Sequence, residues 1–193
     1  MEKSNFWNDA ARCGAILGAV LAFSAIVENK LMLSGSVTLY TLLTVEYLAF
    51  AALHYYLLHR FTRLRSELSD AGEGFSFGQG YRYLLAVSAF AGIIVGAVQY
   101  IHLHLVIGYS EYIDRYVAAL TSVLAQTGGA VSSSMEGVVS QLAGQLGAAA
   151  EPSVIATVWG GVLQSLIFGG IFGVIIAGVL SRPSKPFGTA GEE

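Results

Sequence analysis

Four polar side chains lie inside long apolar runs of this sequence, where a charged or strongly polar group is unusual. They are Glu46, Gln99, His102 and Gln164. An ionised carboxylate in hydrocarbon costs roughly 2.5–3.5 kcal/mol or more, so Glu46 must be protonated, hydrogen-bonded or placed in a wet cavity. A carboxyl group, an imidazole and two amides can bind a proton, a cation or a polar head group. They can also serve only as interhelical hydrogen bonds, and the sequence leaves both interpretations open.

Support for catalytic or metal chemistry is weak. His102 and His104 are two residues apart, whereas two imidazoles share one helical face at a spacing of four, so a zinc pair is not expected. The sequence has no P-loop and no His-Glu-x-x-His motif. Its single cysteine, Cys13, excludes an intramolecular disulfide and a multi-cysteine metal site. We therefore expect a protein that is not an enzyme and that has no metal and no cofactor.

The composition indicates a polytopic membrane protein. Of the 193 residues, 54% are hydrophobic and 12% are charged, well outside the usage of a soluble domain. The apolar runs predict a single all-α membrane domain over residues 1–193 with four transmembrane helices. The predicted spans cover about residues 6–27, 38–58, 81–107 and 153–180. The expected partner is the lipid bilayer, and no nucleic acid is expected.

Residues 110–152, between the third and fourth spans, form the longest hydrophilic region and predict two amphipathic helices. Apolar residues recur at helical spacing from Ile113 to Leu124 and again from Met135 to Leu146. We expect both helices to lie on the outer membrane surface or to fold over the ends of the spans. Residues 181–193 are expected to form a flexible tail.

The positive charges predict how the spans are oriented. With four crossings, eight of the ten lysines and arginines fall on one side, and only Lys30 and Arg115 fall on the other. Lysine and arginine mark the cytoplasmic side, so both termini are predicted to be cytoplasmic. Region 110–152 is then extracytoplasmic.

This topology brings the polar residues to one level in the membrane. Glu46 lies about eight residues below the outer end of its span, or about 12 Å at 1.5 Å per residue. Gln99 and His102 lie at a comparable depth in the third span, and Gln164 approaches that level in the fourth. We therefore predict an outward-facing polar cluster, which is either a ligand site or a lock between helices.

Small residues four apart predict close helix packing, because lipid tails give apolar helices no hydrophobic reason to associate. Gly-x-x-x-Gly pairs occur in three of the four spans. They are Gly14 with Gly18, Gly92 with Gly96, and Gly169 with Gly173. Three such faces favour a tight bundle, and some of them equally suit a homo-oligomer or a partner subunit.

Four arginines form a predicted cytoplasmic basic rim after the second span and at the start of the third. They are Arg60, Arg63, Arg65 and Arg82. One interpretation is that they are only the topology signal. The other is that the rim holds lipid phosphate or an acidic partner surface.

The layout resembles a known family, the bacterial inner-membrane proteins grouped as domain of unknown function 4199. The likeness lies in the segment Phe75-Ser76-Phe77-Gly78-Gln79-Gly80 before the third span, the Tyr100-Ile101 exit, the amphipathic pair and the Gly- and Ile-rich last span. The resemblance implies four spans, a place in the bacterial inner membrane and no assigned activity. It also implies an association with polyprenyl-linked glycosyltransferase systems.

Two functions follow as hypotheses. The first is a non-enzymatic membrane subunit that anchors or assists a membrane enzyme in envelope glycan or lipid assembly, through its small-residue faces and its arginine rim. The second is a small oligomeric transporter or channel-like carrier with its polar site at Glu46, Gln99 and His102.

Overall fold

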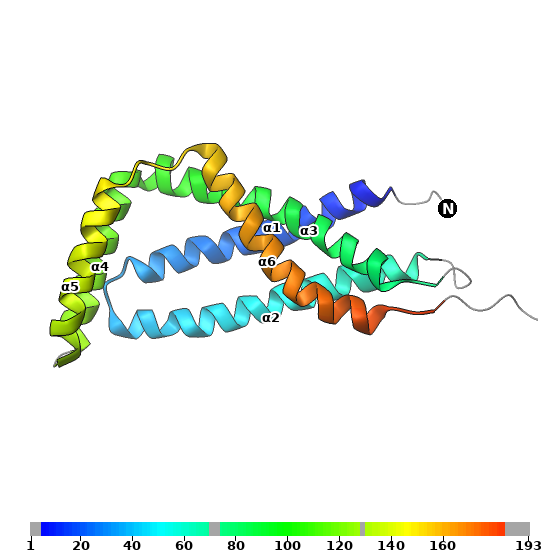
Figure 1. Ribbon diagram of the computed structural model, residues 1–193, viewed down its shortest axis with the longest axis horizontal. Helices are drawn as coiled ribbons and strands as arrows, with labels where there is room; N and C mark the ends of the chain where they lie inside the picture. The colour runs from blue at the N-terminus through cyan, green and yellow to red at the C-terminus, as the bar shows by residue number, and fades with distance from the viewer. Residues whose placement is uncertain (1–4, 70–73, 128–129, 184–193) are drawn as a thin grey trace, which may run out of the picture.

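The computed structural model is a bundle of long helices with a helical hairpin across one end (Figure 1). It describes residues 5–69, 74–127 and 130–183, without the side chains of residues 130–134 and 136. The α-helices are α1 (Phe6–Met32), α2 (Val37–Glu67), α3 (Phe77–Tyr100), α4 (Tyr109–Thr127), α5 (Ala130–Ala148) and α6 (Val154–Leu180). A π-helical segment, Ile101–Ile107, prolongs α3.

The four predicted spans are confirmed as four helices that are long and apolar enough to cross a membrane. Two of them continue beyond the predicted ends. Helix α1 runs to Met32 rather than to residue 27, and α2 runs to Glu67 rather than to residue 58. Hydropathy falls where α2 becomes charged, but arginine and glutamate are good helix formers, so the helix continues past its apolar part.

Helix α3 is the centre of the bundle, and glycines let α6 cross it closely. A Cβ atom at Gly92 would lie 2.5 Å from Cα of Val162, and one at Gly96 would lie 2.6 Å from Cα of Val158. A Cβ atom at Gly161 would lie 2.7 Å from the backbone oxygen of Gly92. At this crossing the backbones of the two helices are therefore in direct contact, which no larger residue permits.

The remaining predicted glycines also face helices of the same chain. Gly14 and Gly18 of α1 pack against Phe90 and Ala91 of α3. On α6, Gly169 faces the side chain of Ser88, and Gly173 faces the ring of Tyr81. All three Gly-x-x-x-Gly faces thus contribute to packing within one chain.

Contacts between α2, α3 and α6 close the end of the bundle opposite the hairpin. The backbones of Phe75 and Arg182 form an antiparallel bridge, and the Arg182 guanidinium donates to the Ser66 carbonyl oxygen at 2.8 Å. The chain just after α6 is therefore held in place, unlike the flexible tail predicted from residue 181. Residues 184–193 of that predicted tail lie outside the described residues.

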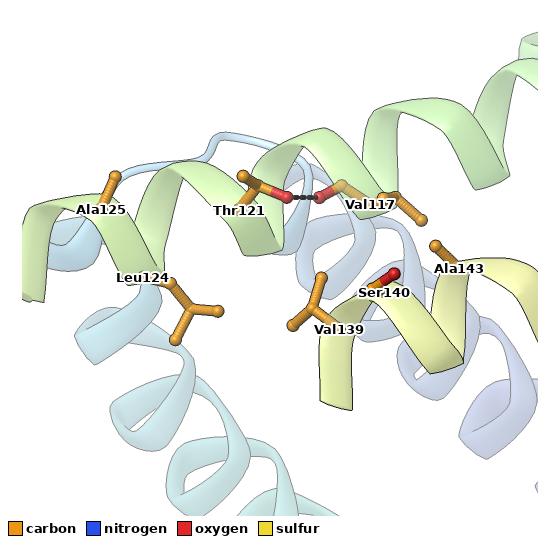
Figure 2. A pocket seen from close by; sticks show the side chains of 7 residues that line it. All are labelled: Val117, Thr121, Leu124, Ala125, Val139, Ser140 and Ala143. Carbon is orange, nitrogen blue, oxygen red and sulfur yellow. Dashed lines mark hydrogen bonds between the residues drawn. The ribbon is translucent and has the colours of Figure 1, made fainter. Parts of the chain in front are cut away.

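Helices α4 and α5 lie side by side across the other end of the bundle (Figure 1). Between them is a cavity of about 250 Å³, into which Leu124 and Val139 point from opposite helices (Figure 2). Its lining carries two hydroxyl groups, on Thr121 and Ser140, and the Thr121 hydroxyl donates to the Val117 carbonyl oxygen of its own helix at 2.9 Å. This cavity therefore offers little chemistry.

Substitution of Gly161 tests the close crossing of α3 and α6. Gly161→Ala places a methyl group against the backbone of α3, and overpacking of this kind costs about 1–3 kcal/mol. The matched control is Gly160→Ala, because a Cβ atom at Gly160 meets nothing within 4 Å. We expect thermal unfolding in detergent to show a lower midpoint for Gly161→Ala and an unchanged or slightly higher one for Gly160→Ala. Equal midpoints would contradict the crossing.

Candidate functional site

A cavity of about 330 Å³, here called the polar cavity, lies among all four spanning helices. Its polar lining consists of Ser24, Glu28, Tyr47, His54, Gln99, Gln164 and Ser165. Its apolar lining consists of Leu21, Ala25, Phe50, Ala51, Val95, Phe168 and Phe172. From Leu21 to Glu28 along α1 the lining extends over about 10 Å at 1.5 Å per residue. No lysine or arginine is among these lining residues, so the only formal charge in the lining is acidic.

Two hydrogen bonds join α1 to α2 beside the cavity. The Ser24 hydroxyl donates to Oε1 of Glu46 at 2.5 Å, and the Tyr47 hydroxyl donates to Oε1 of Glu28 at 2.5 Å. Ser24 and Glu28 are one turn apart on α1, so both bonds lie along the same edge of that helix. Hydrogen bonds to carboxylate oxygens are among the stronger ones, and these two hold both carboxyl groups between the helices.

With Ser165, His54 is one of two buried polar residues in the lining. It is 5% exposed, and its Nε2 atom has no hydrogen-bond partner among the described residues. The edge of its ring meets the ring of Phe172, with 5.4 Å between centroids. The Nε2 atom has almost no accessible surface, so it lies within the wall of the cavity rather than at its surface.

The cavity opens between α2 and α6. Tyr47 of α2 is 49% exposed and Phe168 of α6 is 46% exposed, and Ala51 and Gln164 on the same two helices are also exposed. In contrast, Ala25 of α1 and Val95 of α3, on the opposite side of the cavity, are buried. Because both rim helices are membrane-spanning, this opening faces the lipid.

The structure brings together only part of the predicted polar cluster. Gln99 and Gln164 line the polar cavity. Glu46 does not line it but contacts it through Ser24, and its Oε2 atom is buried without a partner in the described part of the chain. His102 lies in the π-helical segment and is not part of the lining, and its Nε2 is likewise buried and unpartnered within that part.

Five polar residues of the lining are not among the predicted cluster: Ser24, Glu28, Tyr47, His54 and Ser165. Glu28 lies just beyond the predicted first span, residues 6–27, because a charged residue normally marks the end of an apolar run. Ser24 carries no strong sequence signal, since serine is common in membrane helices. A single histidine in an apolar span is commonly a packed residue, and the ring of His54 does pack against Phe172, but its place in the lining is not visible in the sequence.

His104 belongs to a separate cluster where α3 ends. Its Nδ1 lies 2.6 Å from Oε1 of Glu151, and its ring stacks between Tyr100 and Tyr109 at centroid distances of 4.3 and 5.0 Å. This cluster ties the π-helical segment to the start of α6. In the described ranges, no three His, Cys, Asp or Glu side chains gather as metal ligands.

An expectation that the sequence lacks a Gly-x-Ser-x-Gly pattern would be wrong, because Gly74-Phe75-Ser76-Phe77-Gly78 has that form. The pattern indicates a nucleophilic serine only where a strand turns sharply into a helix. Here the Ser76 hydroxyl accepts from the backbone N–H of Gln79 at 3.2 Å, and the Gln79 side chain accepts from the backbone N–H of Ser76 at 2.8 Å. This reciprocal pair is a capping box that starts α3.

The predicted basic rim lies on helices rather than in a loop. Arg60, Arg63 and Arg65 occupy the last turns of α2, and Arg82 lies in the second turn of α3. Arg63 pairs with Glu67 at 3.0 Å. Arg65 lies 3.9 Å from Asp9 and stacks over two aromatic rings. Half of the rim is therefore engaged in contacts within the chain, and Arg60 and Arg82 remain exposed.

Four long apolar helices around a polar cavity define a polytopic α-helical membrane protein. The chain belongs to the family described as protein of unknown function (DUF4199), which it matches over residues 12–182. The family resemblance is thus confirmed. No curated protein and no solved structure matches the chain.

A double-mutant cycle tests the bond between Ser24 and Glu46. Ser24→Ala removes the donor and leaves a buried carboxyl group with no partner, which we expect to cost about 1–2 kcal/mol. In a Glu46→Leu background the same substitution should cost almost nothing, because no acceptor remains. Unfolding free energies in mixed micelles provide the measurement. Equal costs in both backgrounds would show that the bond contributes nothing.

Proposed function

We propose that the protein is a non-enzymatic membrane protein that binds a small polar molecule in the polar cavity and acts as a carrier for it. One observation carries the proposal: polar and acidic side chains line a cavity that opens to the lipid between two spanning helices. Its volume of about 330 Å³ is at the lower end of the range for small-molecule sites and far larger than a single water molecule needs.

The energetics of a bilayer support a ligand rather than a purely structural lock. A lock requires the polar groups to bond one another, as Ser24 and Glu46 do. Gln99 and Gln164 instead line the cavity, and no hydrogen bond joins either side chain to another described residue. Unbonded polar groups within a membrane are costly, so an occupant that bonds them would stabilise the protein.

Filling the cavity tests this function. Ala51→Trp places an indole at the opening, whereas Ala52→Trp, at the adjacent exposed position, adds the same bulk outside the lining. Small amphiphiles of positive, zero and negative charge are added to the protein in detergent. We expect at least one of them to raise the unfolding midpoint of the wild type and of Ala52→Trp. The same molecules should leave Ala51→Trp unchanged. If none stabilises the wild type, or Ala51→Trp responds equally, the proposed function is wrong.

We propose further that both termini lie on the cytoplasmic side of a bacterial inner membrane, with α4 and α5 as amphipathic helices on the outer surface. The proposal is supported by the position of four arginines at the end of the bundle opposite the hairpin: Arg60, Arg63, Arg65 and Arg82. Positive charges of this kind are typical of the cytoplasmic side.

Single-cysteine labelling in a Cys13→Ala background tests this orientation. Gly144 of α5 and Leu68 just after α2 are both exposed and lie at opposite ends of the bundle. A membrane-impermeant maleimide should label Gly144→Cys in intact cells and Leu68→Cys only after the cells are permeabilised. The reverse pattern would place the basic end outside the cell.

A second candidate is the accessory subunit that anchors or assists a membrane enzyme such as a polyprenyl-linked glycosyltransferase. The apolar part of α2 favours it, since only 17% of that window is buried within the chain, against 33–39% for the other spans. That face is available to a partner or to a second copy. A chain that is isolated in a stoichiometric complex, and that no small molecule stabilises, would favour this candidate over the carrier.

A further inference from the structure

The charge of the polar cavity restricts what it can bind. Glu28 is part of the lining, Glu46 lies directly behind Ser24, and the lining contains no basic side chain to balance them. A carboxylate that is not neutralised is costly in a membrane, and an anionic ligand would add repulsion to that cost. A cationic ligand would neutralise the carboxylate and so remove the cost of its charge.

The second carboxylate oxygen of Glu28 strengthens this point. Tyr47 donates to Oε1 of Glu28, so the second oxygen of that carboxyl group can accept from a ligand. Glu46 is not part of the lining, and its Oε2 atom has almost no accessible surface, so Glu46 adds negative charge behind the wall and not an acceptor for the ligand. A ligand that only donates hydrogen bonds, as an ammonium group does, therefore suits this edge of the cavity.

Aromatic rings form the rest of the cage. Tyr47 and Phe50 contribute from α2, and Phe168 and Phe172 contribute from α6. Aromatic faces attract cations through their quadrupoles, and a cage of rings next to a carboxylate is a recurring arrangement for organic ammonium ions. In the part of the chain that the structure describes, no three His, Cys, Asp or Glu side chains gather as metal ligands, so the ring cage favours an organic cation over a metal ion.

The opening between α2 and α6 determines the shape of the ligand. Tyr47 and Phe168 border this opening and are both about half exposed, so an apolar chain can lie between them and extend into the bilayer. The ligand therefore has an apolar part, and it can enter from the membrane without crossing the α4–α5 hairpin.

We infer that the polar cavity binds a small organic ammonium ion that carries an apolar group. Glu28 and the aromatic rings hold the charged head, and the apolar group lies in the opening between α2 and α6. This inference rests on the proposed function, because it names the ligand class of the same cavity.

Three probes that share one apolar group test the inference. They are 2-phenylethylammonium, uncharged 2-phenylethanol and anionic 3-phenylpropanoate. Binding is measured by calorimetry to the protein in nanodiscs of zwitterionic lipid, with empty nanodiscs subtracted. We expect the ammonium probe to bind about tenfold or more tightly than the alcohol, and the anion to bind weakest, because only the ammonium forms an ion pair with Glu28.

Two variants locate the binding. Glu28→Gln keeps an acceptor for Tyr47 but removes the charge, and it should weaken the ammonium probe about tenfold while leaving the alcohol unchanged. Ala52→Trp is the control that should leave both unchanged. The preference of the wild-type protein among the three probes tests the inference even if Glu28→Gln does not fold.

The outcomes separate the inference from the proposed function. Binding of alcohol and ammonium with equal affinity, blocked by Ala51→Trp, would keep the cavity as a ligand site and overturn its choice of a cation. Preference for the anion would overturn it as well. Binding that Ala51→Trp does not affect would overturn the inference and the proposed function together.

Discussion

Direct contact between helix backbones is the constraint on which this bundle depends. In a bilayer, apolar side chains gain nothing by leaving lipid for protein, so helices associate where their surfaces fit closely. Helix α3 provides such surfaces on two sides, toward α6 through Gly92 and Gly96 and toward α1 through Ala91. Helices α1, α3 and α6 therefore form a compact group, and glycines rather than large side chains determine how closely these helices pack.

Helix α2 has no glycine, and its apolar part is the least buried of the four spans. It is attached to α1 by the bonds of Glu46 and Tyr47, and it meets α6 through His54 and Phe172. Bulky side chains hold a helix at a distance, so space remains between α2 and the compact group. The polar cavity is this space, and α1, α3 and α6 contribute polar residues to its lining opposite α2.

The number and type of the spans followed from hydropathy, because a run of about twenty apolar residues is the length of a helix that crosses a bilayer. The small-residue faces were also visible, although Gly161, the residue of α6 that meets Gly92, was not among the predicted pairs. The site was only half predicted. Depth along a span can be counted in sequence, but the rotation of each helix about its axis depends on its neighbours. Gln99 and Gln164 line the cavity, whereas His102, three residues after Gln99, does not.

The hairpin outside the bundle is bonded to the helix that borders the cavity. The Gln126 side chain of α4 accepts from the backbone N–H of Val37 at 3.2 Å and donates to the carbonyl oxygen of Gly35 at 2.7 Å. Val37 is the first residue of α2, where helix N–H groups lack partners within the helix. A tilt of α2 that widens the opening to α6 must therefore either break the hydrogen bonds of Gln126 or move α4 together with α2. Ser122 of α4 also donates to the Gly35 carbonyl oxygen, at 3.0 Å, so the position of the hairpin and the width of the opening are coupled through these two side chains.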